Sequence, residues 1–185
     1  MTARAAQGKP ESVPEALRPL GGLWQERATA RADGAVPAVA GAYLLAVWLP
    51  APVALPPRLV TAARPALAPG WVVYAGSARG PGGLRARLAR HLRPDKRRRW
   101  HVDWPTTAPG ARIWVQAVPG GDECALVARL LAEAGATVPV PGFGSSDCRT
   151  CPAHLLALPE APRHGLRRIR RRATGTLESA SESVL

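Results

Sequence analysis

Sulfur-containing and aromatic residues are scarce in this sequence, which has three cysteines, two tyrosines and one phenylalanine in 185 residues. No apolar segment typical of a secretory signal stands near the N-terminus, so we expect a cytoplasmic protein. Three thiols in that compartment are expected to stay reduced. A disulfide framework is therefore not expected to hold this fold together.

The sequence also lacks a long apolar run without helix breakers. The segment 34–57 contains no charged residue, but prolines interrupt it at positions 37, 50, 52, 56 and 57. Proline breaks a helix, and a membrane-spanning helix needs about 20 apolar residues. We therefore expect a buried strand in this segment and no contact with a membrane.

Acidic residues are few, with 13 Asp and Glu against 25 Lys and Arg, for a formal net charge of +12. The excess is concentrated in 85–99 and 163–172. It favours an acidic partner, nucleic acid first of all. Arginine used by default as the basic residue of the chain would give the same clusters. The residues expected to contact nucleic acid are Arg85, Arg90, Arg93, Lys96, Arg97, Arg98 and Arg99.

We expect one α/β domain over 37–159, preceded by a flexible extension over 1–36 and followed by a basic disordered tail over 160–185. A short helix around 15–31 is compatible with the extension's alanines and leucines. Between the first two strands of the domain, residues 53–68 are expected to form an extra ribbon or an ordered loop.

Apolar alternation predicts strands over 41–49, 71–77 and 111–118, with a short closing strand within 152–158. The first two are expected to pair antiparallel, and the first is apolar on both faces, which is typical of a central strand. Helices are predicted over 84–93, ended by Pro94, and over 123–134, capped by Asp122 and ended by Gly135.

Both tyrosines stand near a glycine in a predicted strand, as Gly41-Ala42-Tyr43 and Tyr74-Ala75-Gly76. A tyrosine in a strand ordinarily fills core space. Helical spacing, however, places Arg87 and His91 on or beside the apolar stripe of the helix that follows, and a buried charge must be paired or used. Two phenols, a guanidinium and an imidazole brought together are suited to phosphodiester chemistry.

Glu123 lies on the apolar stripe of the second helix, just before Leu126 and Val127. A carboxylate in the first turn either complements the helix dipole or, facing a basic groove, ligates a divalent cation. The second alternative predicts Mg²⁺, or Mn²⁺, at Glu123.

The motif Cys148-Arg149-Thr150-Cys151-Pro152-Ala153-His154 supplies three ligand types that suit Zn²⁺. A structural zinc site requires four ligands, so Cys124 or Asp147 would have to complete it. Ordinary half-buried thiols are the favoured interpretation of Cys148 and Cys151.

At these residues the sequence resembles the GIY-YIG nuclease superfamily. Gly41-Ala42-Tyr43 and Tyr74-Ala75-Gly76 are similar to its two signature motifs, and Arg87, His91 and Glu123 to its helix-borne Arg and His and its metal-binding Glu. More specific resemblances point to a branch known as domain of unknown function 123, also found fused to endonuclease III-type proteins. They lie in Trp100-His101-Val102-Asp103, in Glu123-Cys124 and in Gly142-Phe143-Gly144-Ser145-Ser146-Asp147-Cys148.

The resemblance covers about 40–158 and implies a small α/β domain with a central three-stranded antiparallel sheet. It also implies metal-dependent hydrolysis of DNA phosphodiester bonds, in DNA repair or recombination. Tyr43 or Tyr74 would deprotonate the attacking water, which requires nearby cations to lower a phenol pKa of about 10. Arg87 would stabilise the transition state, Glu123 would hold the metal, and His91 and His101 would relay protons.

Two departures from the superfamily leave other functions open. The tyrosines are 31 residues apart, which implies an insertion, and the sequence contains no asparagine, although many such nucleases carry a late Asn. Asp147 or Ser146 would have to replace it. The alternatives are a nucleic-acid-binding module without catalysis and an adaptor to DNA-repair proteins.

Overall fold

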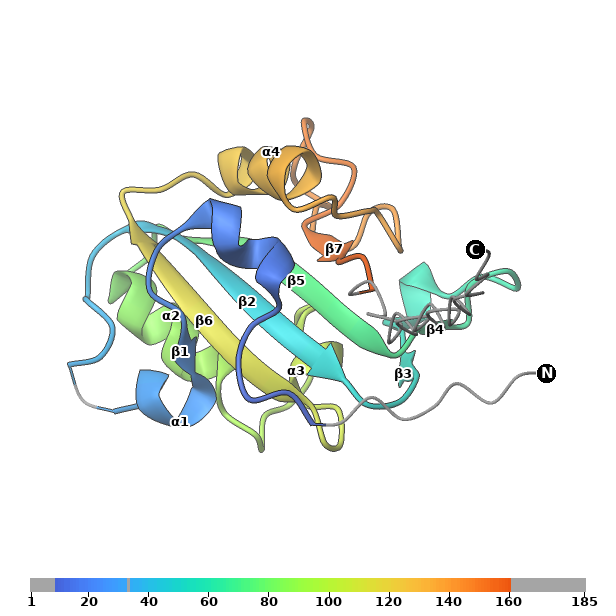
Figure 1. The fold of residues 1–185 in the computed structure, drawn as a ribbon, viewed down its shortest axis with the longest axis horizontal. Coiled ribbons are helices and arrows are strands. Elements are labelled where there is room, and N and C mark those ends of the chain that lie inside the picture. Colours follow the sequence, from blue (N-terminus) through green and yellow to red (C-terminus); the bar gives the residue numbers. More distant parts are fainter. Residues whose placement is uncertain (1–8, 33, 161–185) are drawn as a thin grey trace, which may run out of the picture.

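A computed structural model of the chain describes residues 9–32 and 34–160. Its centre is a five-stranded antiparallel sheet in the order β1-β6-β2-β5-β7 (Figure 1). The strands are β1 (Gln25–Glu26), β2 (Gly41–Leu49), β5 (Gly70–Ala78), β6 (Arg112–Pro119) and β7 (Leu155–Ala157). The three predicted long strands are confirmed as β2, β5 and β6, and the predicted closing strand is confirmed as β7. The expected three-stranded central sheet is corrected to five strands, because β1 and β7 extend it at its two edges.

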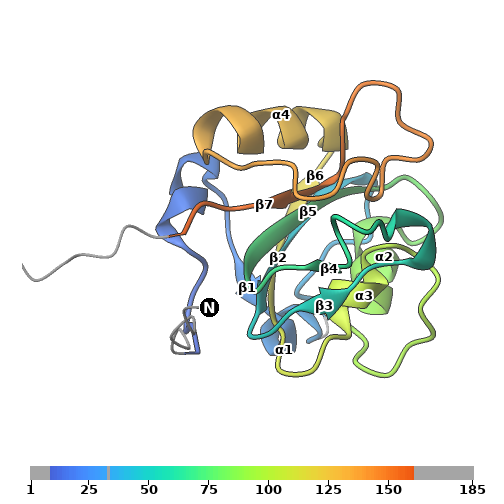
Figure 2. The ribbon, with the colours of Figure 1, turned by 90° about the vertical axis from the view of Figure 1, so that its right-hand side faces the viewer.

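The central strand β2 is buried along its whole length because both of its faces are covered. Tyr43, Leu45 and Val47 face a core that includes Leu84 and Leu88 of α2 (Gly83–His91). The alternate residues face a second core, which includes leucines of α4 (Glu123–Glu133). Figure 2 shows α2 and α3 (Asp103–Thr106) on one side of the sheet and α4 on the other.

Residues between β2 and β5 form a two-stranded ribbon of β3 (Val53–Ala54) and β4 (Ala66–Leu67), with a 3₁₀ turn, η2 (Pro57–Leu59), between them. This ribbon accounts for the long spacing between the two tyrosines. Val53, Leu55 and Leu67 are buried in the α2-side core, so the insertion packs against the domain.

The expectation of a loose N-terminal extension is wrong for residues 9–32. A 3₁₀ helix, η1 (Glu15–Leu20), packs on α4 with Leu17 fully buried, and β1 pairs with β6 before α1 (Arg27–Ala30) begins. The short helix considered around 15–31 is thus represented by two separate elements, η1 and α1, with β1 between them. The proline and glycines of this segment limit local helix formation, whereas its leucines gain from burial.

Both predicted helices of the domain are confirmed, with α2 ending at His91. Asp122 caps α4 by accepting hydrogen bonds from the backbone NH groups of Cys124 and Ala125, and Gly135 follows with φ of 60°. Within residues 9–32 and 34–160, no helix is both long and apolar enough to span a membrane. The basic segment 163–172 lies outside the described residues.

Candidate functional site

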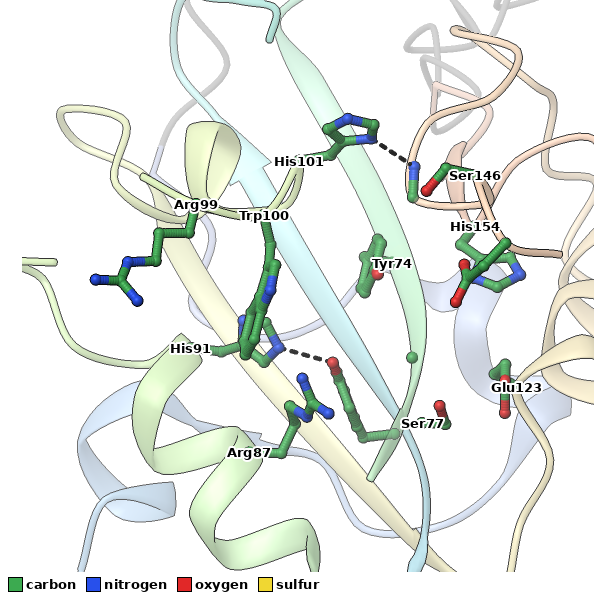
Figure 3. Close-up of a pocket in the computed structure, with 14 residues that line it drawn as sticks. Tyr74, Ser77, Arg87, His91, Arg99, Trp100, His101, Glu123, Ser146 and His154 are labelled. Atoms are coloured by element: carbon green, nitrogen blue, oxygen red, sulfur yellow. Dashed lines mark hydrogen bonds between the residues drawn. The ribbon is translucent and has the colours of Figure 1, made fainter. Parts of the chain in front are cut away.

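A cleft of about 450 Å³ opens where β2 and β5 meet α2, the start of α4 and the 142–147 loop (Figure 3). Its walls contain all six residues predicted to carry catalysis or metal binding: Tyr43, Tyr74, Arg87, His91, His101 and Glu123. The remaining lining residues are Gly76, Ser77, Arg99, Trp100, Gly144, Ser146, Asp147 and His154. Glu123 enters from the α4 side and faces Arg87 across the strands.

Strand register brings the two tyrosines to one face of the sheet. Tyr43 is opposite Gly76 and Leu45 is opposite Tyr74, so the two phenol rings are neighbours with centroids 6.4 Å apart. A Cβ atom at position 76 would overlap the Tyr43 hydroxyl and lie 2.9 Å from the Tyr74 ring. Glycine at this position is therefore what allows the phenols to lie side by side.

Gly144 makes a second close approach, from the opposite wall. Its φ is +74°, which favours glycine, and a Cβ atom there would lie 2.6 Å from a ring carbon of Tyr74. Two glycines distant in sequence thus leave the space that Tyr74 occupies.

The Tyr43 hydroxyl and His91 Nε2 form a buried hydrogen bond of 2.7 Å. Burial, assisted by the charge of Lys96, lowers the pKa of His91 to about 3, so its imidazole is neutral at pH 7. Nδ1 of the same ring is buried and has no hydrogen-bond partner among the described residues. The bond thus joins a neutral phenol to a neutral imidazole, and its polarity follows the imidazole tautomer.

The expectation that nearby cations lower the tyrosine pKa values is wrong for this structure. Burial raises the pKa of Tyr43 well above 10, and it raises the pKa of Tyr74 to about 12 although Arg87 acts in the opposite direction. Both phenols are therefore protonated at neutral pH. Desolvation of the phenolate outweighs the attraction of the guanidinium because Tyr43 is buried and Tyr74 is partly buried in the cleft wall.

The ring of Trp100 packs against two arginines of α2. The sequence did not indicate that Trp100 belongs to the site. Its ring lies 4.6 Å from the Arg87 guanidinium carbon and 3.8 Å from that of Arg90, and its centroid is 5.2 Å from that of His91. Cation–π contacts of this kind restrict the guanidinium positions. Trp100 therefore restricts the position of Arg87 in the cleft wall.

The buried side chain of Asp103 holds Trp100 and Arg90 in this arrangement. Its carboxylate accepts two hydrogen bonds from Arg90, at 2.9 and 2.8 Å, and two from the backbone NH groups of Arg99 and Trp100. Burial alone would raise its pKa, but these bonds lower the pKa to about 2. A carboxylate three residues after Trp100 and directly before Trp104 was the available sequence signal.

Two residues predicted to contact nucleic acid are used by this network. Arg90 is paired with Asp103, and the Lys96 ammonium is buried, 2.9 Å from the Thr106 hydroxyl and 3.8 Å from Asp103, with the His91 carbonyl as a further acceptor. Burial lowers the pKa of Lys96 to about 8. Neither side chain projects freely into solvent.

The other predicted nucleic-acid contacts are exposed: Arg85, Arg93, Arg97, Arg98 and Arg99. Arg85 and Arg93 line a separate hollow beside α1. Arg85 donates to the Val36 carbonyl at 3.0 Å, and Arg98 to the Thr107 hydroxyl at 3.1 Å. Of the five, Arg99 lines the cleft itself.

His101 connects the two walls. Its Nδ1 accepts a hydrogen bond of 3.0 Å from the backbone NH of Gly144, so the neutral ring carries its proton on Nε2. Burial and the nearby charge of Arg58 lower its pKa. His101 therefore holds the 142–147 loop over Tyr74.

The hydrogen-bonding capacity of the Glu123 carboxylate is only partly used by the protein. Its Oε2 atom is buried, has no hydrogen-bond partner among the described residues and lies 3.7 Å from the exposed guanidinium of Arg79. Asp147 lines the same cleft. An orphaned carboxylate oxygen beside a polar cavity fits Mg²⁺ or Mn²⁺, which need few protein ligands.

The cysteine motif acquires a fourth member. The ligand atoms of Cys124, Cys148, Cys151 and His154 all lie within 4.8 Å of one another. Of the two residues considered as a completing ligand, Cys124 joins the group, whereas Asp147 lines the cleft. Cys148, Cys151 and His154 come from the sequence motif, and the packing of α4 brings Cys124 to them.

The sequence matches the model of one protein family. The family model described as Domain of unknown function DUF123 matches residues 42–174. No curated protein and no solved structure matches the chain.

Proposed function

The chain belongs to the DUF123 family, and we propose that it is a metal-dependent endonuclease of the GIY-YIG type that hydrolyses DNA phosphodiester bonds. One observation carries the proposal: Tyr43, Tyr74, Arg87, His91, His101 and Glu123, which come from five separate segments, line a single cleft. Chance packing of buried tyrosines does not account for a guanidinium, two imidazoles and an orphaned carboxylate around them.

Arg87 supports the phosphoryl-binding role. It lies in the cleft wall with its guanidinium stacked on Trp100, and it has no acidic partner among the described ion pairs. Its charge is therefore available to a phosphate, where it would stabilise the negative charge that develops in the transition state.

Tyr43 and His91 support proton transfer as a unit. With both groups neutral, the Tyr43 oxygen takes a proton from the attacking water while its own proton passes to His91 Nε2, in the tautomer that leaves Nε2 free. The water oxygen forms a bond to phosphorus as the phosphorus–oxygen bond to the leaving group breaks. Tyr74, whose phenol is protonated, and His101, with its proton on Nε2, are donors for the phosphate or the leaving oxygen.

Glu123 would hold the divalent cation, with Asp147 as the other carboxylate of the cleft. When bound, Mg²⁺ or Mn²⁺ supplies Lewis-acid polarisation of the phosphate and lowers the pKa of nearby groups. Asp122 contributes indirectly, because its cap fixes the first turn of α4 and thereby the Glu123 backbone.

A nicking assay with Mg²⁺ or Mn²⁺ on branched, flapped and abasic DNA tests the proposal. Glu123→Gln should reduce cleavage at least ~100-fold. Glu133→Gln is the matched control, because Glu133 lies on the same helix, paired with exposed Arg129 and outside the cleft. Absence of cleavage by the wild type, or equal cleavage by both variants, would show that the cleft is not a nuclease site.

The second candidate is a nucleic-acid-binding module without catalysis. The raised pKa values of Tyr43 and Tyr74 and the absence of asparagine favour it. This alternative expects metal-independent binding of uncleaved DNA that weakens about 10³-fold or more between 50 and 200 mM salt if six or more phosphates are neutralised.

A further inference from the structure

Three cysteines and one histidine gather beside the cleft from segments distant in sequence. Cys124 belongs to the first turn of α4, Cys148 and Cys151 to the loop that follows Val140, and His154 directly precedes β7. Their ligand atoms lie within 4.8 Å of one another. These are the only cysteines of the chain, so the fold brings every thiol to one point.

The spacing of the sulfur atoms suits a shared cation. A tetrahedral zinc ion with Zn–S bonds of about 2.3 Å keeps neighbouring sulfurs about 3.8 Å apart. The Sγ atoms of Cys124 and Cys148 are 3.6 Å apart, and a disulfide would require about 2.05 Å.

Hydrogen bonds around the sulfurs resemble the outer shell of a metal site. The backbone NH of Cys151 donates to Cys148 Sγ at 3.3 Å, and the Thr150 hydroxyl is 3.6 Å from Cys148 Sγ and 3.8 Å from Cys124 Sγ. Donors of this kind stabilise a thiolate and fix the direction of its lone pairs.

His154 supplies an independent observation. The residue is 6% exposed, and its Nε2 atom is buried without a hydrogen-bond partner among the described residues. A neutral imidazole leaves one nitrogen with a lone pair for a ligand bond, and leaving it unpaired in the interior is costly. The His154 imidazole thus has a nitrogen without a hydrogen-bond partner among the described residues, close to three thiols.

We propose that Cys124, Cys148, Cys151 and His154 bind a structural zinc ion. Three thiolates and one imidazole form a closed tetrahedral set, which leaves no open position for water and is typical of structural sites. Soft sulfur ligands favour zinc over magnesium or calcium. The ion is therefore separate from the cation assigned to Glu123.

The zinc ion joins α4 to the loop that covers the cleft. Cys124 follows Glu123 directly, and Gly144, Ser146 and Asp147 precede Cys148 in the loop. One bound ion thus fixes the wall that carries the Glu123 carboxylate. This inference does not rest on nuclease activity.

Metal analysis of the full chain tests the site directly. The chain, expressed with zinc and dialysed under reducing conditions, should contain one zinc ion per molecule. Replacement by Co²⁺ should give a sulfur-to-cobalt charge-transfer band and the intense visible bands of tetrahedral cobalt. A wild-type chain that retains no zinc, or that holds Co²⁺ without a thiolate band, would overturn the proposal.

Variants identify the ligands. Cys148→Ser should weaken zinc binding by ~100-fold or more, since outer-shell changes alone cost 10–100-fold. Asp147→Asn is the matched control from the adjacent position, and it should retain zinc. If Cys148→Ser does not fold, Cys124→His keeps four ligands and should retain the metal with a charge-transfer band weaker by about a third. An unchanged band in Cys124→His would contradict the assignment.

Discussion

The Tyr43 hydroxyl lies 2.7 Å from His91 Nε2, and neither group is charged at neutral pH. This bond crosses from the central strand of the sheet to the last residue of α2. Both residues line the same cleft as Arg87, and in the proposed nuclease mechanism they would transfer the proton of the attacking water.

Tyr43→Phe removes the hydroxyl and keeps the ring. Cleavage of DNA is expected to fall by about 10²–10⁴-fold, the usual size of a general acid–base contribution. Stability should fall by about 1–3 kcal/mol, because His91 Nε2 is left buried and unpaired. Single-turnover cleavage at saturating DNA and urea unfolding separate the two effects, and near wild-type cleavage by a folded variant would remove Tyr43 from the mechanism.

Gly76→Ala tests the close approach of the two phenols. The added methyl group would overlap the Tyr43 hydroxyl, so we expect a loss of about 1–3 kcal/mol in unfolding free energy and displacement of both rings. Gly80→Ala is the matched control, since a Cβ atom there meets nothing within 4 Å. Its stability should change by less than about 1 kcal/mol. Equal stability of the two variants would show that the tyrosine packing tolerates a side chain.

Asp103→Asn leaves Arg90 and Lys96 without their carboxylate. We expect a loss of about 3 kcal/mol at pH 7, and Asp95→Asn, at an exposed position, should lie within about 0.5 kcal/mol of the wild type. Folding lowers the Asp103 pKa from 3.8 to about 2, so its contribution is complete above pH 4 and is lost as pH falls through about 2.

Urea unfolding at several pH values between 4 and 2 checks whether the contribution of Asp103 to stability falls as the pH falls. The stability difference between the wild type and Asp103→Asn should narrow steadily from pH 4 towards pH 2. A difference that stays constant over that interval would mean that folding does not shift the pKa of Asp103.

Much of this protein could be predicted because the relevant patterns are local. Alternation of apolar residues identified β2, β5 and β6, Asp122 and Gly135 marked the ends of α4, and helical spacing turned Arg87 and His91 towards the sheet. Each of these follows from backbone periodicity or capping, which neighbouring residues determine.

Tertiary structure decided what depends on distant segments. Only packing reveals that Leu17 joins the α4 side of the core and that β1 extends the sheet, since their local sequence is irregular. Only the docking of α4 brings Cys124 to Cys148, 24 residues away. Burial likewise raised the tyrosine pKa values, whereas nearby cations had been expected to lower them, because desolvation depends on the whole surrounding fold.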